Sequence, residues 1–143
     1  MNIGKLIEDR PSSDIITVGI DQPVRDAVAI LASKRIGALP VMDGDTVAGI
    51  FSERDVIYRL ADEGQSCLDR VVGDVMTAPA ITIDRQTDIL DALGLMSKRR
   101  IRHLPVLDGQ RMCGFISIGD LVQGRLNEIQ REASEMRAYI QTA

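Results

Sequence analysis

The chain of 143 residues repeats itself at a fixed offset of 65 residues. GIFSERD, residues 49–55, and GFISIGD, residues 114–120, share a glycine, a serine and an aspartate in the same order. Without gaps, residues 16–56 align with residues 81–121, and the identities extend to the Leu-Pro-Val triplets beginning at Leu39 and Leu104. An internal repeat constrains the fold before any other feature does, because each copy must form the same unit. We therefore predict a duplicated unit.

Each copy begins with the pattern of a short strand followed by an amphipathic helix. Residues 15–20 and 80–83 are rich in β-branched residues, which favour strands. Apolar residues then recur at helical spacing, at Val24, Ala27, Val28 and Leu31 in the first copy and at Ile89, Leu93 and Met96 in the second. In the first copy we expect Asp21 to cap this helix and Pro23 to lie in its opening turn.

A β-hairpin and a second helix complete each copy. The Asp-Gly pairs at Asp43 and Asp108 are a strong short-range indication of a tight hairpin. The strand after each pair runs directly into another helical pattern. The predicted order is therefore β-α-β-β-α, twice, in a mixed α+β fold that is close to α/β architectures.

Neither copy is expected to be stable alone, because a unit of about 50–60 residues buries little surface. We expect the two halves to pack sheet to sheet about a pseudo-two-fold axis. The predicted boundaries are residues 1–64 for the first repeat, 65–79 for a linker, 80–125 for the second repeat and 126–143 for a C-terminal helical extension. Clefts should open where the strand ends of one half meet the other, since strand ends that meet helix starts commonly hold ligands.

Composition and charge argue against several classes of function. The formal net charge of −4 gives no general attraction to nucleic acid or to anionic membranes, and base-stacking aromatic residues are scarce. The sequence has no Gly-rich phosphate loop and no nucleophile paired with a base, so these features of an enzyme are missing. One histidine and two distant cysteines, Cys67 and Cys113, make a metal site unexpected. Unpaired thiols and the lack of a signal-type apolar stretch lead us to expect a cytoplasmic location.

The Ser-x-x-Asp motifs, Ser52 with Asp55 and Ser117 with Asp120, admit two interpretations. A serine followed three residues later by an acid is close to a capping box at a helix start, although Glu or Gln is preferred at that position. A helix N-terminus also offers free backbone N–H groups and the positive end of a dipole, which suit phosphate. An aspartate there is able to accept hydrogen bonds from both hydroxyls of a ribose. The two roles can coexist in one motif.

Together these features resemble the cystathionine β-synthase (CBS) domain pair, or Bateman module. The resemblance covers about residue 3 to about residue 125 and is carried by DVMT (74–77), RIRHLPVLDG (100–109) and GFISIGD, with the weaker first-copy versions RIGALPVMDG (35–44) and GIFSERD. The chain looks like a stand-alone, bacterial-type CBS domain protein. The resemblance implies that AMP, ADP, ATP, NAD or S-adenosylmethionine binds in clefts between the repeats.

The resemblance also implies which residues line each site. In the family, backbone from the first strand and from the residues before Leu-Pro holds the adenine. Carried over, these are Thr82, Ile101, Arg102 and His103 for the second copy, with Thr77 from the linker, and Thr17, Ile36, Gly37 and Ala38 for the first copy. The two Ser-x-x-Asp motifs add Ser52, Asp55, Ser117 and Asp120, and Arg54 adds a phosphate contact.

The two predicted sites differ in charge. We expect the second Ser-x-x-Asp motif to share its site with Arg102 and His103, and the first to share its site with Arg54 and the opposing Glu53. An arginine makes charge-assisted contacts to phosphate, whereas a carboxylate repels it. On this pairing the second site holds a phosphate-bearing ligand more tightly. The alternative is that Arg102 and His103 are solvated or packing residues.

A long helical pattern follows the second motif, from Gly119 to about Ile140. Its apolar residues follow a 4-3-4-3-4 spacing, at Val122, Leu126, Ile129, Ala133, Met136 and Ile140. This is an a/d seam, although it is shorter than the three to four heptads that indicate a coiled coil. We expect it to pack against a second subunit in a homodimer. The alternative is a helix that lies on its own domain.

The main functional hypothesis is a non-enzymatic regulatory module. It would bind an adenine nucleotide such as AMP, ATP or NAD between its repeats and signal to a partner protein of unknown identity, with no catalytic cofactor. The main alternative is an interaction or assembly module with no physiological nucleotide ligand. An enzyme and a nucleic-acid binder rank lower, because the basic run KRRIR, residues 98–102, is local and the whole chain is acidic.

Overall fold

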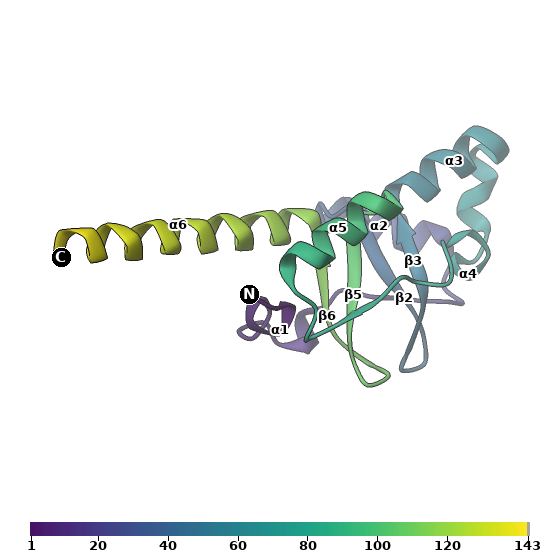
Figure 1. Cartoon of the computed structure of the whole chain (residues 1–143). Helices are drawn as coiled ribbons and strands as arrows, with labels where there is room; N and C mark the ends of the chain where they lie inside the picture. Colours follow the sequence, from purple (N-terminus) through teal and green to yellow (C-terminus); the bar gives the residue numbers. More distant parts are fainter. Residues whose placement is uncertain (143) are drawn as a thin grey trace.

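The structure, a computed structural model, describes residues 1–142 and contains two three-stranded sheets of the same design (Figure 1). They consist of β1 (Val18–Gly19), β2 (Ala38–Asp43) and β3 (Thr46–Ser52), and of β4 (Ile83–Asp84), β5 (His103–Asp108) and β6 (Arg111–Ser117). In each sheet the short first strand runs parallel to the middle strand, and the third runs antiparallel to it. The predicted duplication and the α+β fold class are confirmed.

Four longer helices and two short ones accompany the strands. The longer ones are α2 (Val24–Lys34), α3 (Glu53–Glu63), α5 (Ile89–Arg99) and α6 (Ile118–Thr142). The short ones are α1 (Ile3–Leu6) and α4 (Val72–Val75), with the 3₁₀ turns η1 (Ser12–Asp14) and η2 (Gly64–Asp69). Because α2 and α5 follow the first strand of each sheet, and α3 and α6 follow each hairpin, the predicted order β-α-β-β-α occurs twice.

The hairpins form where the Asp-Gly pairs predicted them. Gly44 and Gly109 have φ angles of 61° and 66°, the left-handed region that glycine adopts without steric cost. In both hairpins the register shifts once, after Val41 and after Val106. The two copies therefore share even their irregularities.

Two local predictions were wrong in detail. The first strands are only two residues long, because Val18 and Gly19 alone pair with β2 while the residues before them leave the sheet. Asp21 does not cap α2: the helix begins at Val24, and the N–H of Val24 donates instead to the carbonyl of Arg70 at 2.7 Å. A backbone carbonyl from a distant segment therefore takes the place of a side-chain cap.

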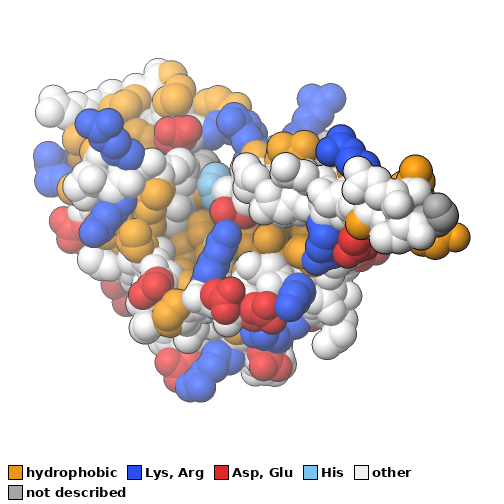
Figure 2. Space-filling model, turned by 90° about the vertical axis from the view of Figure 1, so that its left-hand side faces the viewer, with side chains coloured by type: hydrophobic (Ala, Val, Ile, Leu, Met, Phe, Trp, Pro, Cys, Tyr) orange, Lys and Arg blue, Asp and Glu red, His pale blue; other side chains and the backbone are white. Residues whose placement is uncertain are grey.

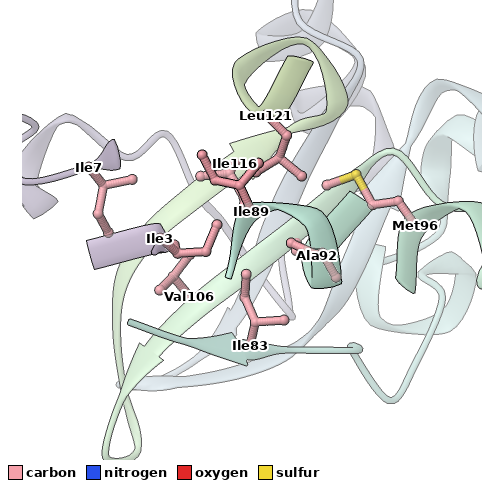
Figure 3. Close-up of a cluster of buried hydrophobic side chains, with 10 residues drawn as sticks. Ile3, Ile7, Ile83, Ile89, Ala92, Met96, Val106, Ile116 and Leu121 are labelled. Carbon is pink, nitrogen blue, oxygen red and sulfur yellow. The ribbon is translucent and has the colours of Figure 1, made fainter. Parts of the chain in front are cut away.

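Each repeat has its own aliphatic core. The first contains Val18, Val24, Ala27, Leu31, Leu39, Val41, Phe51, Val72 and Val75. The second contains Ile3, Ile7, Ile83, Ile89, Ala92, Met96, Leu104, Val106, Ile116 and Leu121 (Figure 3). The predicted inward faces of α2 and α5 are confirmed, and β3 lies against β6 where the two repeats meet.

The two short helices pack on the repeat opposite to the one that they precede. The N–H of Ile3 in α1 donates to the carbonyl of Thr87 in the second repeat at 2.8 Å. The N–H of Val72 in α4 donates to the carbonyl of Gln22 in the first repeat, also at 2.8 Å. Each repeat thus completes its core with the helix that leads into the other repeat in sequence.

This exchange changes how the predicted boundaries are understood. Ile3 and Ile7 fall within residues 1–64 but belong to the second core. Of the predicted linker, residues 65–79, the part up to residue 75 is a folded part of the first repeat, and its Cys67 is fully buried. Between the exchanged helix and the following strand, the chain crosses from one repeat to the other at residues 8–17 and at residues 76–82. We call these the first and second crossing segments.

The C-terminal helix α6 is 25 residues long and contacts the body only near its start. Leu121, Gly124 and Glu128 are buried there, whereas residues 131–142 are exposed. Figure 1 shows the rest of the helix projecting away from both repeats. The alternative of a helix lying on its own domain is therefore wrong for this part. Within residues 1–142, no helix combines the length and the apolar character that a membrane crossing requires.

The packing of the linker against β3 predicts the effect of a single methyl group. A Cβ added at Gly49 would lie 2.6 Å from the Thr77 carbonyl oxygen, so Gly49→Ala should lower the free energy of unfolding by about 1–3 kcal/mol. A Cβ at Gly94, within α5, would meet nothing within 4 Å, and Gly94→Ala should raise it by about 0.5–1 kcal/mol. Urea denaturation measures both. Equal effects of the two variants would contradict the packing described.

Candidate functional site

Two clefts open where the crossing segments pass between the repeats. We name them the Asp55 cleft and the Asp120 cleft, after the aspartate in each. Their volumes are ≈ 450 Å³ and ≈ 290 Å³, within and at the lower end of the range typical of small-molecule sites. Each cleft combines a Ser-x-x-Asp motif from one repeat with a crossing segment and with the loop before the middle strand of the other repeat.

The Asp55 cleft is lined by both repeats and by the second crossing segment. The first repeat contributes Ser52, Glu53, Arg54, Asp55 and Tyr58, together with Gly37, Ala38 and Ile50; the second repeat contributes residues 99–103; the crossing segment contributes Thr77 and residues 79–81. Arg100 ends α5 in the left-handed conformation, with φ of 56°. This residue turns the chain from the helix into the stretch that lines the cleft.

The Asp120 cleft is built in the same way from the opposite halves. The second repeat contributes His103, residues 113–115, Ser117 and Asp120; the first repeat contributes Ile36 and Ala38; the N-terminal segment contributes Ile7, Arg10, Pro11 and residues 14–16. Four isoleucines, at positions 7, 15, 16 and 36, give the lining much of its aliphatic character. Ala38 and His103, which occupy equivalent positions in the two copies, border both clefts.

Both Ser-x-x-Asp motifs form capping boxes, so the structural interpretation is confirmed. The Ser52 N–H donates to Asp55 Oδ2 at 2.9 Å, and the Asp55 N–H donates to Ser52 Oγ at 3.4 Å. The second motif repeats this arrangement at 2.9 Å and 3.1 Å. Each cap uses one oxygen of its aspartate and leaves the other facing a different partner.

The second oxygen distinguishes the two aspartates. Asp55 Oδ1 accepts a hydrogen bond from the Thr77 hydroxyl at 3.0 Å, whereas Asp120 Oδ1 lies 3.2 Å from the Arg10 guanidinium. Partial burial raises the pKa of Asp120. The hydrogen bond from the Ser117 backbone and the ion pair with Arg10 outweigh this effect and hold the pKa below its ordinary value.

His103 lies in the wall between the clefts and stacks on Phe115, with ring centroids 5.5 Å apart. Figure 2 shows the chain's only histidine recessed in a hollow among hydrophobic and charged side chains. Burial of the imidazole lowers the pKa of His103, and the neighbouring Arg102 lowers it further, while Asp120 and Glu53 act in the opposite direction. The net effect favours the neutral imidazole.

Most residues predicted from the sequence line one of the two clefts. Gly37, Ala38, Ser52, Arg54, Asp55, Thr77, Ile101, Arg102 and His103 line the Asp55 cleft, and Ile36, Ala38, His103, Ser117 and Asp120 line the Asp120 cleft. Thr17 and Thr82 line neither cleft, whereas Ile16 lines the Asp120 cleft and Ile81 lines the Asp55 cleft. Each of these isoleucines immediately precedes a predicted threonine.

The predicted pairing of the site residues is corrected. Arg102 lines the cleft of Asp55, not that of Asp120, because the loop before β5 faces the helix start of the other repeat. The expectation that the second motif holds phosphate more tightly rested on the wrong pairing. Arg10, Asp14, Arg99 and Arg100 were not predicted as site residues; nothing local marks Arg10 and Asp14, whereas Arg99 and Arg100 belong to the basic run at residues 98–102. Gly4 and Gly73 indicate which repeat each short helix packs against. Each approaches a carbonyl of the opposite repeat, and the spacing between the two glycines differs from the spacing of the repeats.

Comparisons with known proteins identify the family. The CBS domain family model matches residues 6–62 and 72–127. The chain belongs to the CBS domain family. A protein with CBS domains from Burkholderia ambifaria MC40-6 superposes with a TM-score of 0.81 at 37% identity, covering 89% of this chain and 95% of that one. A CBS-domain containing protein from Agrobacterium tumefaciens gives 0.81 at 32% identity, covering 87% and 99%.

Curated relatives differ in how much of their length this CBS domain pair spans. The mitochondrial CBS domain-containing protein CBSX3 of Arabidopsis thaliana is 38% identical over 85% of this chain and 61% of its own length. YhcV of Bacillus subtilis is 25% identical over 90% and 89%. Inosine-5′-monophosphate dehydrogenases also match, but over only 21–24% of their length. The likeness to those enzymes therefore assigns no dehydrogenase activity to this chain.

One solved relative carries a nucleotide. CBSX2 of Arabidopsis thaliana, whose structure is a complex with AMP, superposes with a TM-score of 0.76 at 28% identity, covering 88% of this chain and 96% of that one.

The environment of Asp120 predicts a pH-dependent stability. Because its folded-state pKa lies below the ordinary 3.8, the ionised carboxylate stabilises the fold at neutral pH, and this contribution is lost as the pH falls from about 4 through the folded-state value. Asp120→Asn should therefore be less stable than the wild type at pH 7, and the difference should shrink at pH 3. Denaturation at both pH values, with Asp108→Asn on the exposed hairpin as control, checks this. A difference independent of pH would contradict it.

Proposed function

We propose that this CBS domain pair is a regulatory module that binds an adenine nucleotide between its repeats and thereby signals to a partner protein. The observation that carries the proposal is the position of Asp55. Its carboxylate lies at a helix start of the first repeat, in a cleft that the second crossing segment and residues 99–103 of the second repeat complete. A ligand held there contacts both repeats.

Each part of a nucleotide finds suitable chemistry in this cleft. Ile50, Ile81 and Ile101 offer the aliphatic surface that an adenine needs in a protein poor in aromatic residues. The Asp55 carboxylate accepts three hydrogen bonds, from the Ser52 N–H, the Ser52 hydroxyl and the Thr77 hydroxyl, and retains lone-pair capacity to accept from a ribose hydroxyl. Arginines nearby offer charge-assisted contacts to phosphate. NAD-type ligands present the same adenosine group.

Signalling would follow from the way in which the ligand bridges the repeats. A ligand that contacts both halves favours the arrangement in which they lie together, and it shifts the population toward that state by its differential affinity. Surfaces near the clefts would then change for a partner protein. The alternative, an assembly module without a physiological nucleotide, keeps the same fold and leaves the clefts as structural gaps.

Nucleotide binding should be measurable as stabilisation. AMP, ATP or NAD should raise the melting temperature, because a ligand that binds only the folded state stabilises it by mass action. A micromolar Kd, about −8 kcal/mol, would be ordinary for such a site. Asp55→Asn keeps an oxygen for the cap but removes the charge, and should weaken binding; Asp62→Asn, an exposed change on the same helix, should not. No effect of millimolar nucleotide in melting and calorimetry would favour the assembly module.

The exposed seam of α6 supports the homodimer as part of the proposed function. Ile129, Met136 and Ile140 are 47–65% exposed, and the seam lies roughly a third of a turn from the face that packs on the body. In a parallel pairing of two copies, Glu132 at a g position of one helix lies beside Arg137 at an e position of the other. Two copies of α6 therefore match each other in both the spacing of their apolar residues and the placement of their charges.

Substitutions on the seam should separate the subunits. Ile129→Lys with Met136→Lys puts unpaired charges into the proposed interface and should convert a dimer into a monomer in sedimentation velocity. Ser134→Lys with Gln141→Lys adds the same charge to the same exposed helix away from the seam and should leave the dimer intact. A wild-type monomer would contradict the proposal, and a dimer that survives the seam variant would move the interface to other helices.

A further inference from the structure

The two clefts occupy equivalent places in the duplicated fold but differ in charge. Four arginines and two carboxylates line the Asp55 cleft: Arg54, Arg99, Arg100 and Arg102 against Glu53 and Asp55. One arginine and two carboxylates line the Asp120 cleft: Arg10 against Asp14 and Asp120. The first lining is therefore net positive and the second net negative.

Ion pairing increases the difference in charge between the two clefts. Arg10, the one cation of the Asp120 cleft, is already engaged by Asp120 at 3.2 Å. Among residues 1–142, none of the four arginines of the Asp55 cleft forms an ion pair within 4.0 Å; Arg54 contacts only the Arg100 carbonyl, at 3.5 Å. These guanidinium groups remain available to an anionic ligand.

The duplication shows where the difference arises. At the positions equivalent to Arg54 and Arg102, the other copy has Gly119 and Gly37. The capping aspartate and the aliphatic crossing residues occur in both copies. The features suited to an adenosine group are therefore shared. Arg54 and Arg102 have no basic counterpart, and Lys34 and Arg35, the counterparts of Arg99 and Arg100, do not line the Asp120 cleft.

We infer that the clefts divide ligand chemistry: the Asp55 cleft takes an adenine nucleotide with its phosphates, and the Asp120 cleft takes an adenosyl compound whose 5′ substituent is uncharged or cationic. The inference rests on the proposed function and adds the class of ligand for each cleft. A polyphosphate gains from unpaired guanidinium groups, whereas in the Asp120 cleft it would meet two carboxylates and one neutralised arginine. The smaller, more aliphatic cleft suits a nucleoside that lacks phosphate.

Titration calorimetry with ATP and with adenosine tests the division, since the two share the adenosyl group and differ in the triphosphate. We expect ATP to bind at one site per chain. Arg54→Ala with Arg102→Ala should weaken ATP binding about tenfold or more, as expected for the loss of charged hydrogen bonds, and change adenosine binding little. Arg111→Ala with Arg131→Ala removes the same charge outside both clefts and should leave ATP binding unchanged.

A gain of function complements this loss. Gly119 is the position equivalent to Arg54, so Gly119→Arg gives the second Ser-x-x-Asp motif the arginine that the first motif has. An added Cβ at Gly119 meets only Ser117 Oγ, at the ordinary distance of 3.6 Å. This variant should acquire a second ATP site. One outcome would contradict the division but leave the proposed function standing: adenosine and ATP both bind, ATP binding is unchanged in Arg54→Ala with Arg102→Ala, and ATP binding is lost in Asp120→Asn. If neither ligand binds, both are wrong.

Discussion

The exchange of two short helices is the constraint on which the rest of the molecule depends. Each core is closed by backbone hydrogen bonds and isoleucine or valine side chains from the segment that leads into the other repeat, as at Ile3 and Val72. The chain must then cross between the repeats twice. Because each crossing segment passes the helix start of the repeat that it has just packed against, the clefts are formed by both repeats and by neither alone.

The capping boxes connect stability with the proposed chemistry. A cap that uses one carboxylate oxygen orients the aspartate, and the second oxygen is directed toward the crossing segment. The two copies keep this framework and differ in what surrounds it. Thr77 is a neutral partner for Asp55, whereas Arg10 neutralises Asp120. Duplication followed by local change in charge thus yields two sites with the same geometry and different electrostatics.

Local patterns predicted most of the fold, because hairpin turns, helical periodicity and the internal repeat are all properties of contiguous sequence. The Asp-Gly hairpins and the buried faces of α2 and α5 are confirmed for this reason. The site residues were found one by one, but Arg102 was assigned to the wrong aspartate. That assignment depends on which repeat each lead-in helix packs against, a long-range choice that Gly4 and Gly73 mark only weakly. The missing cap at Asp21 has the same origin, since a carbonyl from residue 70 replaces it.

The central claim is that each ligand cleft joins a helix start of one repeat to a loop of the other. Hydrogen–deuterium exchange with and without saturating ATP tests it most directly, because it locates protection along the chain. The account predicts slower exchange in two separated stretches, residues 52–55 of the first repeat and residues 99–103 of the second, together with the second crossing segment. Protection confined to residues 99–103 and 117–120, within the second repeat alone, would contradict it.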